Sequence, residues 1–200
     1  MFYRPENGHG LPHNPFNAII APRPIGWIST RGSDGHDNLA PYSFFNGVAY
    51  EPPQVMFAST GDKPDRPGTK DSVAQIAESR VFCINIADGA LKDAMNASSA
   101  MLPAGVSEFE AAGLTAAPCE TIDCPRVAEA AASLECRMTR IIRLAGKANH
   151  MVLGVVTGIH LRDDCVVEGR FDLRRSGWLS RLGYHDYAIT TELFEMRRPD

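Results

Sequence analysis

The chain has 200 residues, 44% of them hydrophobic, so it can bury a substantial core without disulfide bonds or a structural metal. Twenty Lys and Arg residues against 24 Asp and Glu residues give a net charge of −4, which argues against a nucleic-acid-binding protein. The sequence shows no signal-peptide pattern and no apolar run long enough to span a bilayer, so we expect a cytoplasmic protein that does not enter membranes.

The cysteines do not form a recognisable ligand or disulfide pattern. Their number is five, an odd count, and no two have the CxxC spacing. We therefore predict reduced thiols and no metal site. Residues 1–15 are rich in proline and glycine and are predicted to form an irregular N-terminal arm, in which the pair His9 and His13 is not expected to bind a metal. No internal repeat occurs, so residues 1–200 are predicted to form a single domain.

Residues 23–46 are predicted to form a strand, a tight turn at 32–35 and a second extended run from Leu39 to Phe45. Pro41 within the second run cannot donate to a sheet ladder, which favours an edge position. Irregular pairing around Ala40–Ser43 would leave backbone and hydroxyl groups available to a flat, anionic, amide-rich ligand.

A second candidate binding feature follows a short strand at 54–59 and a charged loop at 61–68. Ser72 and Gln75 have the spacing of a capping box, which predicts a helix that begins at Ser72. Lys70 and the Ser72 hydroxyl would then lie beside the free N–H groups of a helix start, where an anion can bind. The alternative is purely structural, since many helices are capped by serine and preceded by lysine.

The rest of the chain is predicted to alternate strands and short helices. Residues 81–87 form a buried strand in which Asn85 ties down a loop, and 90–100 form a helix. Ser107 opens a short helix that ends at Gly113, with 98–106 as a spacer and 118–131 as a loop. Residues 134–144 and 151–161 form an antiparallel pair that closes a barrel, and 190–196 form a last strand.

The motifs RPIGWIST and NLAPYSFFN resemble those of the flavin-reductase-like FMN-binding proteins, and weaker matches extend the resemblance over residues 22–187. Lys70-Asp71-Ser72 resembles the Lys-Asp-Thr motif of that family. His150 matches a histidine near the flavin, although Val155 stands where the family has glutamate. Arg181 and Tyr187 match an ending that lies near the flavin or completes the dimer.

The resemblance implies a mainly β protein with a few helices, an FMN-binding split β-barrel of Greek-key type. It also implies a homodimer that binds FMN non-covalently, accepts hydride from NADH or NADPH, and supplies a partner monooxygenase. Ring walls would come from Trp27, Tyr42 and Phe44, phosphate contacts from Ser43, Ser59, Lys70 and Ser72, and proton handling from His150. The full expected cofactor site is Trp27, Ser29, Thr30, Ala40, Pro41, Tyr42, Ser43, Phe44, Ser59, Lys70, Asp71, Ser72, Arg181 and Tyr187.

Two alternatives remain open from the residues. One is an FMN-dependent electron carrier or oxygenase of the same fold. The other is a barrel without redox function that binds a different phosphorylated ligand.

Overall fold

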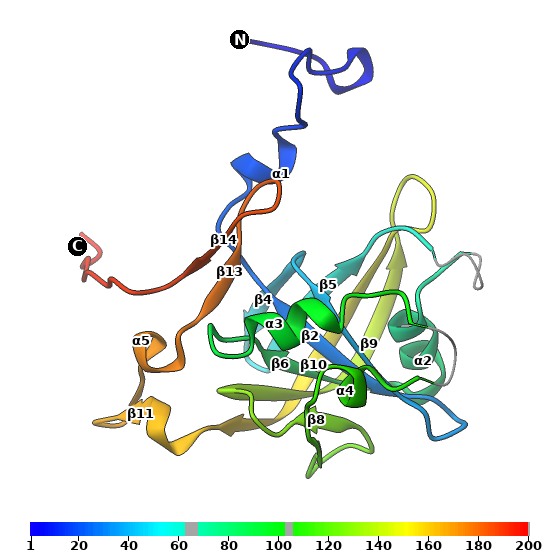
Figure 1. Cartoon of the computed structure of the whole chain (residues 1–200), viewed down its shortest axis with the longest axis vertical. Coiled ribbons are helices and arrows are strands. Elements are labelled where there is room, and N and C mark those ends of the chain that lie inside the picture. The colour runs from blue at the N-terminus through cyan, green and yellow to red at the C-terminus, as the bar shows by residue number, and fades with distance from the viewer. Residues whose placement is uncertain (63–67, 103–105, 200) are drawn as a thin grey trace.

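The computed structural model describes residues 1–62, 68–102 and 106–199, and its centre is one seven-stranded antiparallel sheet. The strand order is β3-β2-β6-β9-β10-β5-β4, and the sheet curls so that β4 and β5 lie behind β2 in the view of Figure 1. The strands are β2 (Gly26–Arg31), β3 (Asp37–Tyr42), β4 (Phe45–Tyr50), β5 (Pro53–Ser59), β6 (Val81–Ile86), β9 (Ala132–Arg143) and β10 (His150–Leu161). The mainly β, split-barrel prediction is confirmed.

Smaller elements surround this sheet. A three-stranded sheet extends from it toward both termini and contains β1 (Arg23–Pro24), β13 (Leu179–Arg181) and β14 (Tyr187–Ile189). Two two-stranded sheets consist of β7 (Ala116–Pro118) with β8 (Pro125–Val127) and β11 (Val166–Val167) with β12 (Arg170–Phe171). The helices are α1 (Phe16–Ile19), α2 (Asp71–Ser79), α3 (Lys92–Ala97), α4 (Glu108–Ala111) and α5 (Leu173–Ser176), with 3₁₀ turns at Pro5–Asn7 and Asp163–Cys165.

Strand β2 separates two hydrophobic clusters because its side chains alternate between the two faces. Ile28 packs with Phe57 and Phe82 in the barrel interior, where Ile76 of α2 joins them. Trp27 faces the opposite way and packs in a second cluster that includes Leu39, Met95, Phe109 and Val127. This cluster fixes α3 and α4 over the outer face of β2 and β3, which positions both helices beside the edge strand.

Several local predictions are confirmed. The hairpin β9–β10 pairs antiparallel along its length, and β5 and β6 occupy their expected positions. Asn85 ties down a loop, because its Oδ1 accepts a 2.8 Å hydrogen bond from the Val127 backbone N–H and its Nδ2 donates to the Trp27 carbonyl. Gly113 ends the short helix region with a φ of +66°.

Other boundaries differ from the prediction. The extended run expected at 39–45 breaks after Tyr42, and a new strand begins at Phe45, so the edge of the sheet turns at this point. Helix α3 is shorter than the predicted 90–100, the 118–131 loop contains β8, and the last strand is β14 rather than 190–196. Parts of the predicted loop at 61–68 and of the spacer at 98–106 lie outside the described residues.

The capping box predicted at Ser72 and Gln75 is wrong. The N-cap of α2 is Lys70 rather than Ser72, and no side chain caps that helix start. Gln75 instead accepts a hydrogen bond from the Thr30 hydroxyl, because tertiary contacts outweigh the local option. Ser107 does occupy the N-cap of α4 but makes no side-chain cap bond.

The five cysteines are free, and three that are distant in sequence lie together. Cys83 and Cys124 pack in one buried cluster, with the partly buried Cys119 against it. In the described part of the chain, no helix has the length and apolar character needed to cross a bilayer.

Candidate functional site

Two adjoining cavities lie along the edge strand β3, at the point where it ends. The larger, about 420 Å³, is called the lysine pocket because Lys70 and the start of α2 form one side of it. The smaller, about 320 Å³, is called the arginine pocket because Arg23 and Arg181 line it. Pro41 and Ser99 line both cavities, so the two pockets adjoin. The remaining described residues of the lysine pocket are Asn38, Ala40, Tyr42, Thr60, Asp62, Asp71, Ser72, Ser98, Ala100, Met101 and Glu108.

The Ser72 hydroxyl is the centre of a small hydrogen-bond network in the lysine pocket. Asn38 Nδ2 donates to Ser72 Oγ at 2.8 Å, and the Tyr42 hydroxyl donates to the same atom at 3.2 Å. Burial raises the pKa of Tyr42, which keeps its hydroxyl protonated as a donor. Both lone pairs of Ser72 Oγ are therefore occupied, and its own O–H is left to donate to an acceptor.

Lys70 lies next to this network. Its Nζ is 5.9 Å from the centroid of the Tyr42 ring, and its backbone is the N-cap of α2. The nine-residue helix has no side-chain cap at this end, so the positive end of its dipole faces the pocket beside the lysine. An ammonium group, a hydroxyl donor and a helix start therefore converge on one region.

Edge strand β3 pairs with β2 on one side, and a carboxylate contacts its outer edge. Glu108 Oε2, at the start of α4, accepts a 3.2 Å hydrogen bond from the Leu39 backbone N–H. Leu39 N–H therefore points away from β2, and Pro41, two residues along, has the same orientation. The missing N–H of Pro41 thus costs no ladder bond, which explains why the edge strand accepts a proline.

Carboxylates moderate the charge of the lysine pocket. Asp62, Asp71 and Glu108 line it together with Lys70, so three acids face one lysine among the described lining residues. Net charge alone would not attract an anion here. Binding of a phosphate in this pocket would depend on directed donors.

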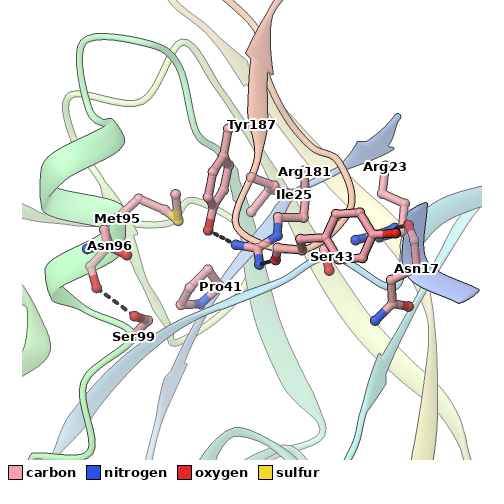
Figure 2. A pocket seen from close by; sticks show the side chains of 11 residues that line it. Asn17, Arg23, Ile25, Pro41, Ser43, Met95, Asn96, Ser99, Arg181 and Tyr187 are labelled. Carbon is pink, nitrogen blue, oxygen red and sulfur yellow. Dashed lines mark hydrogen bonds between the residues drawn. The ribbon is translucent and has the colours of Figure 1, made fainter. Parts of the chain in front are cut away.

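The arginine pocket has the opposite electrostatic character. Arg23 of β1 and Arg181 of β13 are directly opposite partners in the small sheet, so their side chains lie on the same face (Figure 2). Among its described lining residues there is no Asp or Glu. Its other lining residues are Asn17, Ile25, Pro41, Ser43, Met95, Asn96, Ser99, Tyr184 and Tyr187.

Each arginine is held by neutral acceptors. The Arg23 guanidinium is buried and donates to the carbonyls of Asn17, Ile20 and Leu182, at 2.8 Å for the last two. Arg181 donates to the Tyr187 hydroxyl and lies over its ring, 4.5 Å from the centroid. Burial, and then the neighbouring charge of Arg181, lower the pKa of Arg23.

The structure brings many of the predicted residues to these two cavities. The lysine pocket contains six of them, and the arginine pocket contains four, with Pro41 common to both. The first group is Ala40, Pro41, Tyr42, Lys70, Asp71 and Ser72, and the second is Pro41, Ser43, Arg181 and Tyr187.

Three residues of the RPIGWIST motif do not face either cavity. The Trp27 side chain is fully buried, and its Nε1 donates to Ser98 Oγ at 2.9 Å, so its ring cannot form a pocket wall. Ser29 donates to the Pro125 carbonyl at 2.6 Å, and Thr30 donates to Gln75. Their hydroxyls are committed within the core because β2 is the second strand of the sheet rather than its edge.

The remaining predicted residues lie near the pockets without lining them. Phe44 is half-buried beneath the Arg23 guanidinium, 5.9 Å from it. Ser59 and His150 are direct cross-strand partners on β5 and β10. Ser59 Oγ lies close to the Tyr42 hydroxyl, and both Ser59 Oγ and His150 Nδ1 are buried without a hydrogen-bond partner among the described atoms.

Sequence reasoning missed several lining residues. Arg23 and Asn38 lie inside the quoted motifs, so their positions were a signal that could have identified them. Glu108, at the start of α4, was not among the predicted site residues. Asn96 and Ser99 reach the arginine pocket because the second hydrophobic cluster holds α3 in place. No local sequence pattern predicts that position of α3.

Comparison with known proteins identifies the family. The model of the flavin reductase like domain matches residues 20–186. The chain belongs to the flavin reductase like family. The matched segment of this family includes every described residue that lines the two pockets except Asn17 and Tyr187.

Solved structures agree with this assignment. The chain is 30% identical to nitrilotriacetate monooxygenase component B from Bacillus cereus, with a TM-score of 0.82 over 94% of this chain and 100% of that one. It is 28% identical to the 2-nitrobenzoate 2-nitroreductase NbaA from Pseudomonas fluorescens, with a TM-score of 0.80 over 92% of this chain and 88% of that one. A split-barrel protein from Shewanella frigidimarina, assigned as a flavin reductase, shares the fold at 21% identity and a TM-score of 0.81, over 92% and 90% of the two chains.

Proposed function

We propose that this flavin reductase like protein binds FMN non-covalently in the lysine pocket and reduces it with NADH or NADPH. The observation that carries the proposal is the Ser72 hydroxyl, whose oxygen accepts hydrogen bonds from Asn38 and Tyr42, so that its own O–H remains as a donor for a ligand in this pocket. Lys70 and the uncapped start of α2 add a cation and a positive dipole end at the same place.

The residues of the lysine pocket suit both ends of FMN. The phosphate needs a cation and directed donors, which Lys70 and Ser72 supply in spite of the neighbouring acids. The flat ring needs apolar walls. Pro41, on the side shared with the arginine pocket, and Met101 can form them. Asp71 belongs to the same helix start and shares the lining.

When bound, FMN supplies the two-electron chemistry, accepting a hydride from NADH or NADPH and passing the electrons on. The chain's own residues bind and orient the cofactor. Tyr42 and Asn38 fix the Ser72 hydroxyl, and Glu108 fixes the edge strand that carries Ala40 and Pro41.

We further propose a cytoplasmic homodimer that serves a partner oxygenase. Helix α1 exposes Phe16 and Ile19, 54% and 74% exposed, on a segment that projects from the barrel beside the β13–β14 hairpin (Figure 1). Large exposed apolar side chains on a projecting segment favour association with a second copy. The name of the Bacillus cereus neighbour, component B of a monooxygenase, supports an oxygenase partner. The free cysteines favour a reducing compartment.

The test is spectroscopic. Purified protein is titrated with FMN, and the flavin-loaded protein is then mixed with NADH or NADPH under anaerobic conditions. We expect saturable FMN binding and bleaching of the flavin band by at least one nucleotide. If FMN binds but neither nucleotide bleaches it, the protein is an electron carrier or oxygenase that uses another donor. If FMN does not bind while another phosphorylated compound does, the barrel has no redox function.

A second candidate function is reduction of an anionic aromatic compound by the bound flavin. The observation that favours it is the arginine pair next to the proposed flavin pocket, together with the similarity to the 2-nitrobenzoate 2-nitroreductase from Pseudomonas fluorescens. Consumption of NADH with 2-nitrobenzoate as electron acceptor, in the absence of oxygen, would distinguish this function from delivery of reduced flavin.

A further inference from the structure

We infer that the arginine pocket is an anion-binding subsite for the carboxylate or phosphate of a second substrate that meets the cofactor. The identity of that substrate rests on the proposed function, whereas the anion site itself rests on Arg23 and Arg181. The pocket adjoins the lysine pocket at Pro41 and Ser99, so a ligand in one would lie next to a ligand in the other.

The first argument is the pairing of two like charges. Arg23 and Arg181 are directly opposite each other in the β1–β13 ladder, an arrangement that is destabilising for like charges on one sheet face. Arg23 is only 6% exposed, so water screens its charge poorly. The effect of Arg181 in lowering the pKa of Arg23 is consistent with this repulsion.

The second argument is the nature of the partners. Among the described residues, both guanidinium groups donate their hydrogen bonds to backbone carbonyls or to the Tyr187 hydroxyl, all of them neutral acceptors. No carboxylate lines the cavity among its described residues, and Nε of Arg23 is buried without a partner. An anion between the two guanidinium groups would supply the missing negative charge.

The third argument concerns the shape of the ligand. Tyr187 of β14 and Met95 of α3 lie beside the charged end of the pocket (Figure 2), and Tyr184 of the β13–β14 hairpin also lines it, so aromatic and thioether groups are available there. Asn96 on the α3 side offers a neutral amide donor, whereas the Ser99 hydroxyl donates to the Asn96 backbone carbonyl at 2.6 Å (Figure 2). A planar ring that carries an anionic group fits such a lining. Both a nicotinamide dinucleotide, through its phosphates, and an aromatic carboxylate have this chemistry.

The experiment measures anion binding directly. Inorganic pyrophosphate and benzoate are titrated by calorimetry into the full-length protein, with and without FMN, and into Arg181→Gln. We expect at least one probe to bind the wild type and to lose roughly tenfold or more in affinity in R181Q.

Binding of the anion should weaken as the salt concentration is raised. Arg181→Lys should keep more affinity than R181Q, because it retains the charge. Arg140→Gln, an exposed arginine of β9 outside both pockets, is the matched control and should bind like the wild type.

The two probes identify the source of the anion. Preference for pyrophosphate, with a raised KM for the nicotinamide donor in R181Q, assigns the subsite to the donor. Preference for benzoate assigns it to an aromatic carboxylate acceptor. The inference is overturned if neither probe binds, or if R181Q binds both as the wild type does. It is also overturned if R181Q weakens FMN but not riboflavin, since the pocket would then hold the flavin phosphate. Because the probes are also measured without FMN, a failure of flavin binding leaves the anion result interpretable.

Discussion

The lysine pocket and the arginine pocket share a wall but organise charge in different ways. In the lysine pocket one cation is accompanied by Asp62, Asp71 and Glu108, and the specific feature is a directed hydroxyl. In the arginine pocket two cations face each other without an acid among the described lining residues. Directed donors suit a ligand that stays bound in one orientation. Uncompensated charge suits a ligand that must arrive quickly and leave again.

Both pockets exist only while the sheet is folded. We expect protonation of Glu135, on β9, to destabilise that sheet at acid pH. Its buried carboxylate accepts hydrogen bonds from the backbone N–H groups of Glu120 and Thr121, at 2.7 and 2.6 Å, and contacts His160 Nε2. Burial alone would raise its pKa, but the hydrogen bonds from Thr121, Glu120 and His160 outweigh burial and lower the pKa of Glu135 to about 2.

Because the folded-state pKa lies below the unfolded value, this stabilisation is present at neutral pH. It is lost as the pH falls from about 4.5 toward 2, and it amounts to about 3 kcal/mol. Glu135→Gln should lower the free energy of unfolding at pH 7 by a similar amount. Urea unfolding of both proteins at several pH values measures this. The difference between them should shrink in acid, and a difference that stays constant with pH would contradict the assignment.

The lysine pocket is tested most directly by Lys70→Ala. Loss of the ammonium should weaken FMN binding by about 1.5–3 kcal/mol, because a charge-assisted hydrogen bond to the phosphate is removed. Riboflavin, which has no phosphate, should bind the variant as it binds the wild type. Fluorescence titration measures both affinities. Lys92→Ala, at a lysine of α3 that is 54% exposed and lines neither pocket, is the control. Equal FMN affinity in the two variants would remove Lys70 from the site.

Ser72→Ala separates the hydroxyl donor from the lysine charge. The variant should lose about 1 kcal/mol of FMN affinity, because the phosphate loses one neutral donor. It should also lose about 1–3 kcal/mol of stability, since the buried Asn38 and Tyr42 donors would lack their acceptor. Ser72→Thr retains the hydroxyl and is the matched variant. If alanine and threonine bind FMN equally, the hydroxyl has no part in phosphate binding.

Much of this arrangement could be predicted from sequence, and the misses have a common cause. Because side chains alternate along a strand, the predicted strand implies that Trp27 and Ile28 face opposite sides of the sheet, and Pro41 correctly indicated an edge strand. The same alternation does not reveal whether the Trp27 face is covered, and here α3 and α4 bury it. Whether helices cover one face of a strand depends on contacts between segments that are distant in sequence, and local sequence patterns do not predict these contacts.

Capping and pocket composition show the same limit. The spacing of Ser72 and Gln75 suits a capping box, but Ser72 finds partners in Asn38 and Tyr42 on β3. The arginine pair went unrecognised for the same reason. Arg23 and Arg181 are 158 positions apart and meet only because β1 and β13 pair. The resemblance pointed to Arg181, whereas the partner that gives it significance came from topology.

The smallest expected effect belongs to His150, which the family resemblance had suggested as a catalytic group. His150 lines neither pocket in the described part of the chain. Its cross-strand partner Ser59, which lies close to the Tyr42 hydroxyl, also lines neither pocket. His150→Asn should therefore change FMN affinity by less than about 0.5 kcal/mol and leave the rate of flavin reduction within a few-fold of the wild type. Stopped-flow reduction by NADH measures the rate. A general acid or base would cost on the order of a hundredfold. A loss of that size would mean that the bound cofactor extends past Ser59, beyond the walls of the lysine pocket. The cofactor would then contact a third region of the protein, outside both pockets.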